Sequence, residues 1–120
     1  MILYIDGEIP SKKNANKFNT KTRCVYKNKR YKVWYDYAVM QVTAQKAGQP
    51  PVKQPVKVSL KFVHGDFVKR DSDNGVSSIF DLLKDCGIVS DDNWKVIPKY
   101  EVENYYEKGK PCCRVEIVAL

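Results

Sequence analysis

The feature of this chain that most constrains its fold is a strand pattern followed, after a short loop, by a helix pattern. In segment 55–65, PVKVSLKFVHG, apolar residues alternate with mostly polar ones, and this period of two predicts a strand with one buried face. After the loop GDFVKRD, the apolar residues of segment 76–83 recur at helical spacing, and Gly87 suits the end of that helix. A strand that leads into a helix favours a mixed α/β or α+β sheet protein.

Further strands and a second helix are predicted around this unit. Segment 1–9 alternates as a strand, and the Lys- and Asn-rich segment 11–30 is predicted to be a polar loop or an irregular hairpin. Apolar residues recur at helical spacing through segment 30–47, and the following GQPP ends that helix. Segments 94–102 and 112–120 are expected to pair as antiparallel strands. The predicted order is βαβαββ, with two main helices and a mixed β-sheet.

Length and composition indicate one globular unit. The chain has 120 residues, of which 43% are hydrophobic and 29% charged, so we predict a single domain over residues 1–120. No apolar run approaches the ~20 residues of a membrane helix, and Asp6 interrupts the opening segment before a signal-peptide core. We therefore expect a cytoplasmic protein. The four cysteines form no CxxC pair, which favours reduced thiols over zinc ligation.

Charge is distributed unevenly in this basic chain, whose formal net charge is +7. Segment 9–35 carries nine lysines and arginines and no acidic residue, whereas segment 65–92 holds seven of the fourteen acids. A cationic run of this kind is typical of contact with a polyanion such as DNA, and such contacts weaken steeply with salt. The side chains of this run that we expect to contact phosphates are Lys12, Lys13, Asn14 and Lys17.

Two pairs of aspartates are the candidates for chemistry. Asp71 and Asp73 stand two residues apart before the second helix, so in an extended segment their carboxylates would point to the same side. Asp91 and Asp92 follow that helix, and a chain that folds back would bring a third carboxylate beside the first two. Carboxylate oxygens suit Mg²⁺, and such a site can hydrolyse phosphodiesters. Spacing alone, however, favours a structural interpretation, in which these aspartates cap the helix and form a turn.

Other residues have structural alternatives. Asp81 lies on the predicted helix eight residues after Asp73, where it either reaches the metal site or is a solvated charge. His64 ends the clearest strand, and we favour a structural role for it over general acid or base catalysis. The aromatic residues that we expect in the core or in a dimer interface, rather than stacked on bases, are Tyr31, Trp34, Tyr35 and Tyr37.

Three motifs occur in order through the middle of the chain: KRDSDN at 69–74, FDLL at 80–83 and GIVSDD at 87–92. They resemble the R-D-x-D-N, F-D-x-L and late D-D elements of the RusA family of Holliday junction resolvases, with similar spacing. The early segment GEIPSKKN at 7–14 is similar to the N-terminal strand and following loop of that family. The resemblance covers most of the chain and shifts the preference from a structural to a catalytic interpretation of the aspartates.

The resemblance implies a homodimer that resolves Holliday junctions or related branched DNA by paired nicks, in DNA recombination and repair. Many family members are encoded by phages or prophages. The positions that match the family's catalytic metal ligands are Asp71, Asp73 and Asp92, for Mg²⁺ with Mn²⁺ as a substitute. Because the segment after Asp92 is one residue longer than the family's usual pattern, Asp91 stays an alternative ligand, and we prefer Asp92.

The sequence departs from the family at one further position. Where family members place a lysine four residues after the second aspartate of the motif, this chain has Ser77. The candidate replacements for that positive charge are Lys69, Arg70 and Lys84. Lys69 and Arg70 are also expected DNA contacts, and Asn74 is a secondary site residue of the same motif.

The sequence thus supports three hypotheses. The first is a Mg²⁺-dependent, structure-selective endodeoxyribonuclease. The second is a basic module that binds nucleic acid without catalysis, and the third is an accessory protein whose basic face binds an acidic protein partner. Only the first hypothesis requires the aspartates and a metal.

Overall fold

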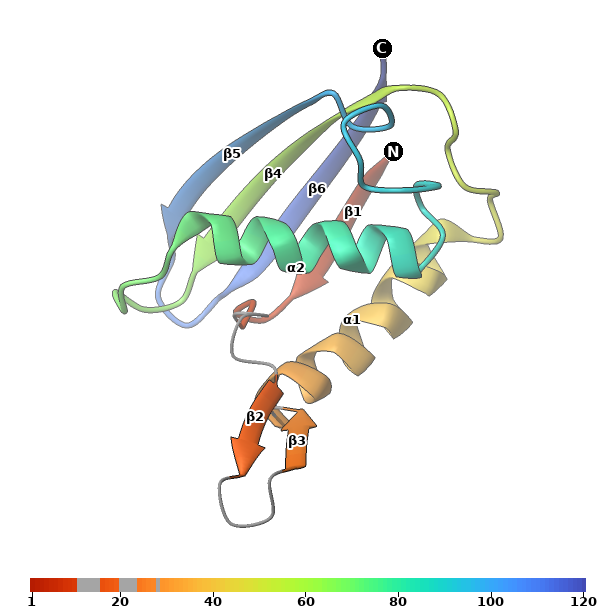
Figure 1. Ribbon diagram of the computed structural model, residues 1–120. Helices are drawn as coiled ribbons and strands as arrows, with labels where there is room; N and C mark the ends of the chain where they lie inside the picture. The colour runs from red at the N-terminus through yellow and green to blue at the C-terminus, as the bar shows by residue number, and fades with distance from the viewer. Residues whose placement is uncertain (11–15, 20–23, 28) are drawn as a thin grey trace.

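A four-stranded mixed sheet with two helices forms the body of the protein in the computed structural model, which describes residues 1–10, 16–19, 24–27 and 29–120 (Figure 1). The sheet has the strand order β1-β6-β4-β5, and a short hairpin forms a separate two-stranded sheet. This is an α+β fold, and the order of the main elements, βαβαββ, is confirmed. The elements are β1 (Ile2–Asp6), β2 (Asn16–Asn19), β3 (Cys24–Lys27), α1 (Lys29–Lys46), β4 (Val56–His64), α2 (Ser72–Asp85), β5 (Lys99–Tyr106) and β6 (Cys112–Ala119).

The pairing of the last two strands differs from the prediction. β5 pairs in parallel with β4, while β6 lies between β1 and β4 and runs antiparallel to both. The predicted antiparallel pair of the last two strands is therefore wrong. The reason is that α2 connects β4 to β5 as the crossover of a βαβ unit, which makes those two strands parallel neighbours. β5 also begins at Lys99, because the residues before it form a turn in which Val96 and Ile97 donate to the Asn93 carbonyl.

The core lies between one face of the sheet and the two helices. Alternate residues of β1, β4 and β6 are buried, as the period of two predicts, and they contact the apolar stripe of α2. Trp34 is buried in this core and Tyr31 and Tyr35 pack against it, whereas the Tyr37 side chain is exposed. The largest fully buried side chains include Leu3, Ile5, Leu60, Ile79, Leu82, Leu83 and Val115.

Helix α1 completes the open edge of the sheet at β1. The Gln41 side-chain oxygen accepts from the Asp6 backbone N–H at 2.9 Å, and the Gln45 oxygen accepts from the Tyr4 N–H at 2.8 Å. The Gln45 amide nitrogen also donates to the Tyr4 carbonyl at 2.7 Å. These side chains form hydrogen bonds with the backbone N–H and C=O groups of β1, which an edge strand would otherwise leave open to pairing with another chain. Of the helices that the structure describes, neither is long and apolar enough to cross a membrane.

Helix α2 runs across the sheet between the two ends of β4 (Figure 1). Its N-terminus lies near the end of β4, where Phe62 and His64 line the same pocket as Asp71. The chain after its C-terminus returns to the start of β4, because the Val56 N–H donates to the Val96 carbonyl at 2.9 Å. The two ends of α2 therefore lie at opposite ends of β4. The Asp71 and Asp73 pair lies at the N-terminal end of the helix, and the Asp91 and Asp92 pair follows its C-terminal end.

Candidate active site

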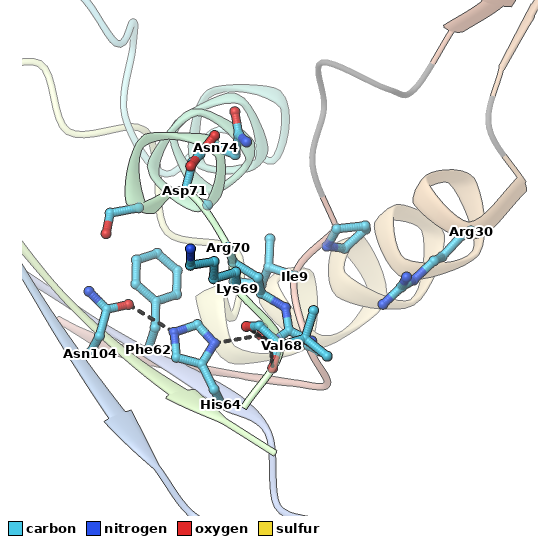
Figure 2. Close-up of a pocket in the computed structure, with 14 residues that line it drawn as sticks. Ile9, Arg30, Phe62, His64, Val68, Lys69, Arg70, Asp71, Asn74 and Asn104 are labelled. Atoms are coloured by element: carbon cyan, nitrogen blue, oxygen red, sulfur yellow. Dashed lines mark hydrogen bonds and ion pairs between the residues drawn. The ribbon is translucent and has the colours of Figure 1, made fainter. Parts of the chain in front are cut away.

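A pocket of about 680 Å³ opens at the N-terminus of α2 (Figure 2). Besides α2 itself, five parts of the chain meet there: the segment after β1, the C-terminal half of β4, the C-terminal half of β5, the loop from β4 into α2, and the start of α1. Its polar lining is cationic and amide-rich, which suits an anionic ligand with hydrogen-bonding groups. The polar lining residues are Glu8, Arg30, His64, Lys69, Arg70, Asp71, Ser72, Asn74 and Asn104.

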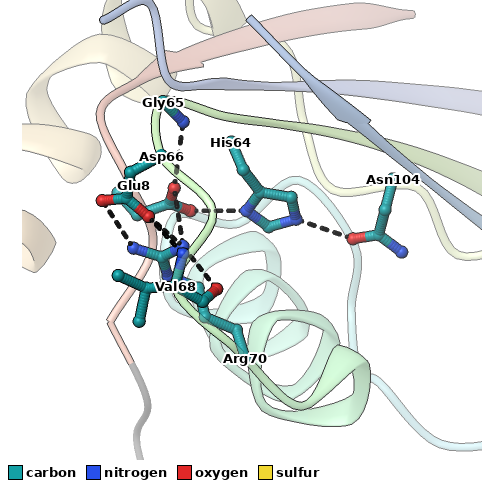
Figure 3. Close-up of polar contacts among 7 residues, drawn as sticks. All are labelled: Glu8, His64, Gly65, Asp66, Val68, Arg70 and Asn104. Atoms are coloured by element: carbon teal, nitrogen blue, oxygen red, sulfur yellow. Dashed lines mark hydrogen bonds and ion pairs between the residues drawn. The ribbon is translucent and has the colours of Figure 1, made fainter. Parts of the chain in front are cut away.

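One wall of the pocket is a hydrogen-bonded chain through His64 (Figure 3). The Nδ1 atom of His64 lies 2.8 Å from a carboxylate oxygen of Glu8, and Nε2 lies 2.8 Å from the side-chain oxygen of Asn104. Both partner atoms are acceptors, so the imidazolium, which donates from both nitrogens, satisfies this arrangement. Burial lowers the pKa of His64, but the hydrogen bonds to Asn104 and Glu8 and the charge of Glu8 outweigh it, and the net pKa shift is upward.

The loop that leads from β4 into α2 is braced by an ion pair. Arg70 donates to both carboxylate oxygens of Asp66, at 2.8 and 3.2 Å, and to the Val68 carbonyl at 3.1 Å. The Val68 N–H donates back to Asp66 at 3.0 Å, and Arg70 lies 3.5 Å from Glu8. The hydrogen bond from Arg70 lowers the pKa of Asp66. Arg70, which we expected to contact DNA, thus holds the loop that precedes Asp71, while Lys69 lines the pocket.

Asp71 and Asp73 both lie exposed at the N-terminal end of α2. Asp71 occupies the N-cap position with extended backbone (φ −76°, ψ 129°), yet its side chain makes no capping hydrogen bond. The helix begins at Ser72, so the two carboxylates do not follow the same-side geometry that an extended segment predicts; Asp73 stands in the first helical turn. The helix end favours negative charge, and the capping role that spacing alone suggested does not engage the Asp71 carboxylate.

Three other residues of the motif region have defined places. Asn74 lines the pocket, and its side-chain oxygen is buried without a hydrogen-bond partner among the residues that the structure describes. Ser77, at the position of the family's lysine, is exposed one turn after Asp73. Asp81 is half-buried farther along α2.

Asp91 and Asp92 lie at the other end of the helix. The Asp91 carboxylate accepts from the Asp92 N–H at 2.8 Å and from the Asn93 side-chain nitrogen at 2.7 Å. It also lies 3.5 Å from the ammonium of Lys84, in the last turn of α2. The hydrogen bond from Asn93, followed by that from the Asp92 N–H, lowers the pKa of Asp91. These contacts make Asp91 the organising residue of a turn.

The aspartates therefore do not converge within one chain. Helix α2 has 14 residues, and at 1.5 Å per residue its ends are about 20 Å apart. The segment after it cannot fold back, because the Val52 N–H donates to the Ile88 carbonyl and the Val56 N–H to that of Val96. Within the described ranges, no group of three His, Cys, Asp or Glu side chains is arranged to hold a metal ion. The expectation that a single chain brings Asp92 beside Asp71 is corrected accordingly.

The donor chemistry of the Asp71 and Asp73 pair nevertheless suits a hard divalent cation. Mg²⁺ takes carboxylate oxygens, commonly from one or two residues, and keeps several waters for substrate phosphates. Two exposed carboxylates beside a cationic pocket supply the oxygen ligands that Mg²⁺ takes. One chain supplies only part of a three-carboxylate set.

Several residues of this site were outside the prediction or cannot be placed. His64 was assigned a structural role, and Glu8, Arg30 and Asn104 were not singled out, although all four line the pocket. No sequence pattern could have found Glu8 and Asn104, because only the tertiary fold brings the segment after β1 and strand β5 to His64 at the end of β4. The predicted DNA contacts Lys12, Lys13 and Asn14 lie outside the described residues, and Lys17 lies in β2, with its side chain outside the description.

The comparison with protein families agrees with the motifs. The family model described as Endodeoxyribonuclease RusA matches residues 6–118, which begin at the last residue of β1, extend into β6 and include both aspartate pairs. No curated protein matches the chain. Because the match extends over nearly all of the 120 residues, the chain belongs to the RusA endodeoxyribonuclease family.

Proposed function

We propose that this protein is a divalent-metal-dependent endodeoxyribonuclease that hydrolyses phosphodiesters in Holliday junctions or related branched DNA, in recombination and repair. Membership of the RusA family supports nuclease chemistry on such junctions. The observation that carries the proposal is the position of Asp71: its exposed carboxylate is not used to cap α2, and it borders a pocket lined by Arg30 and Lys69. An acid without a structural task beside cations is suited to a metal and a phosphate.

Each group at this end of α2 has a role in the proposal. Asp71 and Asp73 hold Mg²⁺, or Mn²⁺ in its place, and the cation supplies Lewis-acid activation of water and of the scissile phosphate. Lys69 and the first backbone N–H groups of α2 orient the phosphate, since helix N-termini bind anions. Arg70 and Glu8 keep the preceding loop in place through their contacts with Asp66 and Gly65. Lys69, which lines the pocket together with Asp71, is the proposed replacement for the lysine missing at Ser77.

The third carboxylate is proposed to come from a second copy of the chain. If two α2 helices pair antiparallel about a two-fold axis, the N-terminus of each lies beside the C-terminus of the other. Asp92 of the partner subunit then joins Asp71 and Asp73, and the same contact recurs at the other end. The two sites would be about 20 Å apart, one for each strand to be nicked. Asp73 and Lys84 are both exposed, near opposite ends of α2, so an antiparallel pair of these helices would place each Asp73 near the partner's Lys84.

The function is tested with synthetic four-way junction, fork and plain duplex DNA, each with Mg²⁺ or EDTA. Wild-type protein should nick near the branch only with the metal. Asp73→Asn, which keeps the side chain's shape, should bind the junction and cleave it more than about 100-fold more slowly. Asp36→Asn makes the same change of charge on the exposed side of α1 and should cleave normally.

A second candidate, the non-catalytic binding module, is favoured by one observation, namely that no three metal-ligating side chains come together among the residues that the structure describes. In that case the Lys-rich segment binds the DNA backbone and the aspartates have no chemical role. Intact junctions under every metal condition, with binding retained, would establish it.

A further inference from the structure

The loop before Asp71 exposes two apolar side chains. Phe67 is 82% exposed and Val68 65%, and both stand at the tip of the loop from β4 to α2. Single exposed apolar residues are common, but here a large aromatic ring and its neighbour are presented together, four residues from a candidate metal ligand. The loop tip is therefore a candidate contact surface.

The loop holds these side chains in a fixed arrangement. Asp66 and Arg70 close the loop on either side of Phe67 with the bidentate ion pair, and the Val68 backbone is hydrogen-bonded to both of them. The Phe67 ring also stacks on Tyr106, at the end of β5, with ring centroids 3.9 Å apart and planes 28° apart. One face of the Phe67 ring is thus supported by the sheet while most of the side chain remains open to solvent. A preorganised aromatic face loses little entropy when a flat ligand stacks on it.

The surroundings indicate what the ligand is. Lys69 and Arg70 follow the apolar tip directly and, with Val68 and Arg30, line the adjacent pocket. Cations beside an exposed aromatic ring suit a nucleic acid, in which a phosphate accompanies every base. Bases in an intact duplex are stacked on one another, whereas a branch point offers bases that have lost a neighbour. Apolar side chains that enter between base steps are a known means of unstacking DNA.

We propose that Phe67, supported by Tyr106 and flanked by Val68, stacks on an unpaired or unstacked base at the branch point and gives the protein its preference for branched over duplex DNA. This inference rests on the proposed function, because it assigns the substrate feature that the site next to Asp71 recognises. Phe67 is a specificity-determining residue, and it takes no part in the hydrolysis.

The test measures binding in EDTA, where no cleavage occurs. Fluorescence anisotropy gives the affinity of each variant for a four-way junction, for a fork and for a duplex of the same length. Phe67→Ala and Phe67→Leu should lower the preference for branched DNA about 5- to 100-fold, the range expected for one stacked base, with duplex affinity unchanged within about twofold. Phe67→Trp should keep the preference. Tyr37→Ala, which removes an exposed aromatic ring from α1, is the matched control.

Circular dichroism shows that each variant is folded, and 2-aminopurine at the branch point gives a direct signal of stacking. Its fluorescence should change on binding of the wild type and of Phe67→Trp, and not on binding of Phe67→Ala. The inference is overturned if Phe67→Ala keeps the wild-type preference, or if Phe67→Leu behaves like the wild type. In the second case the tip makes a general apolar contact of the kind a protein or membrane surface provides.

Junction cleavage by the wild type separates this inference from the proposed function. Cleavage together with an unchanged preference in Phe67→Ala rejects the inference alone. Absence of cleavage together with a lost preference in Phe67→Ala rejects the nuclease and retains the stacking role.

Discussion

The Lys84 ammonium lies 3.5 Å from the carboxylate of Asp91. Lys84 is in the last turn of α2, so this contact, together with the Asn93 and Asp92 hydrogen bonds, keeps the Asp91-Asp92 turn at the end of the helix farthest from Asp71. The separation of the two aspartate pairs is thus a property of the folded chain, and any site that contains both must be shared between copies.

Mixing of two inactive variants tests the shared site. Asp71→Asn and Asp92→Asn should each abolish junction cleavage alone. In a mixed dimer of the two, one site receives both substitutions and the other receives neither, so nicking of one strand should return. If each site lay within one chain, both sites of the mixed dimer would carry a substitution and the mixture would stay inactive. Nicking is measured on labelled junctions after the subunits are refolded together, with each variant refolded alone as the control.

Asp91 and Asp92 should respond differently to substitution. Both oxygens of Asp91 are engaged by the turn and by Lys84, so Asp91→Asn should change junction cleavage by no more than a few-fold. Asp92→Asn should lower cleavage more than about 100-fold, as expected for a metal ligand. Rates are compared at saturating Mg²⁺ with folded protein. The reverse order of effects would make Asp91 the ligand.

The titration of His64 should report its contacts with Glu8 and Asn104. His64 is the single histidine of the chain, so its ring resonances in an NMR titration are unambiguous. We expect a pKa above the ordinary value of 6.5, and a lower pKa in Glu8→Gln, which removes the charge that favours the imidazolium. A pKa at or below 6.5 in the wild type would contradict the hydrogen-bonded arrangement.

The same shift makes the stability of the fold depend on pH. Because the pKa of His64 is raised in the folded state, the stabilisation that it provides is fully present below the unfolded pKa and is lost as pH rises through the folded pKa. The difference in unfolding free energy between the wild type and Glu8→Gln should therefore be larger at about pH 5.5, below the ordinary histidine pKa, than at about pH 8, above it. Urea unfolding measures it.

Ser78 should contribute to stability through one buried hydrogen bond. Its hydroxyl is fully buried and donates to the Pro10 carbonyl at 3.1 Å, which ties the segment after β1 to α2 beside the pocket. Ser78→Ala should lower the free energy of unfolding by about 1 kcal/mol, because the carbonyl loses its partner. Ser77→Ala, the exposed neighbour on the same helix, should stay within about 0.5 kcal/mol of the wild type. Urea midpoints of the two variants give the comparison.

The sequence by itself determined the main helices and strands and the aspartates that are candidate metal ligands. The period of two in segment 55–65 and the helical spacing in segment 76–83 gave β4 and α2, because side-chain periodicity is fixed by local backbone geometry. The motifs around Asp71, Asp73 and Asp92 were sufficient to indicate the family, and the family model agrees.

Only the tertiary structure decided which of these residues meet. The parallel pairing of β4 with β5 follows from the path of α2 across the sheet, and it brings Asn104 to His64. The same path carries Asp92 away from Asp71, by hydrogen bonds between segments that are distant in sequence. Contacts of this kind depend on strand order and loop direction, which no local pattern encodes. The sequence was therefore sufficient to predict which aspartates are candidates, while the fold determined that one chain holds them at opposite ends of α2.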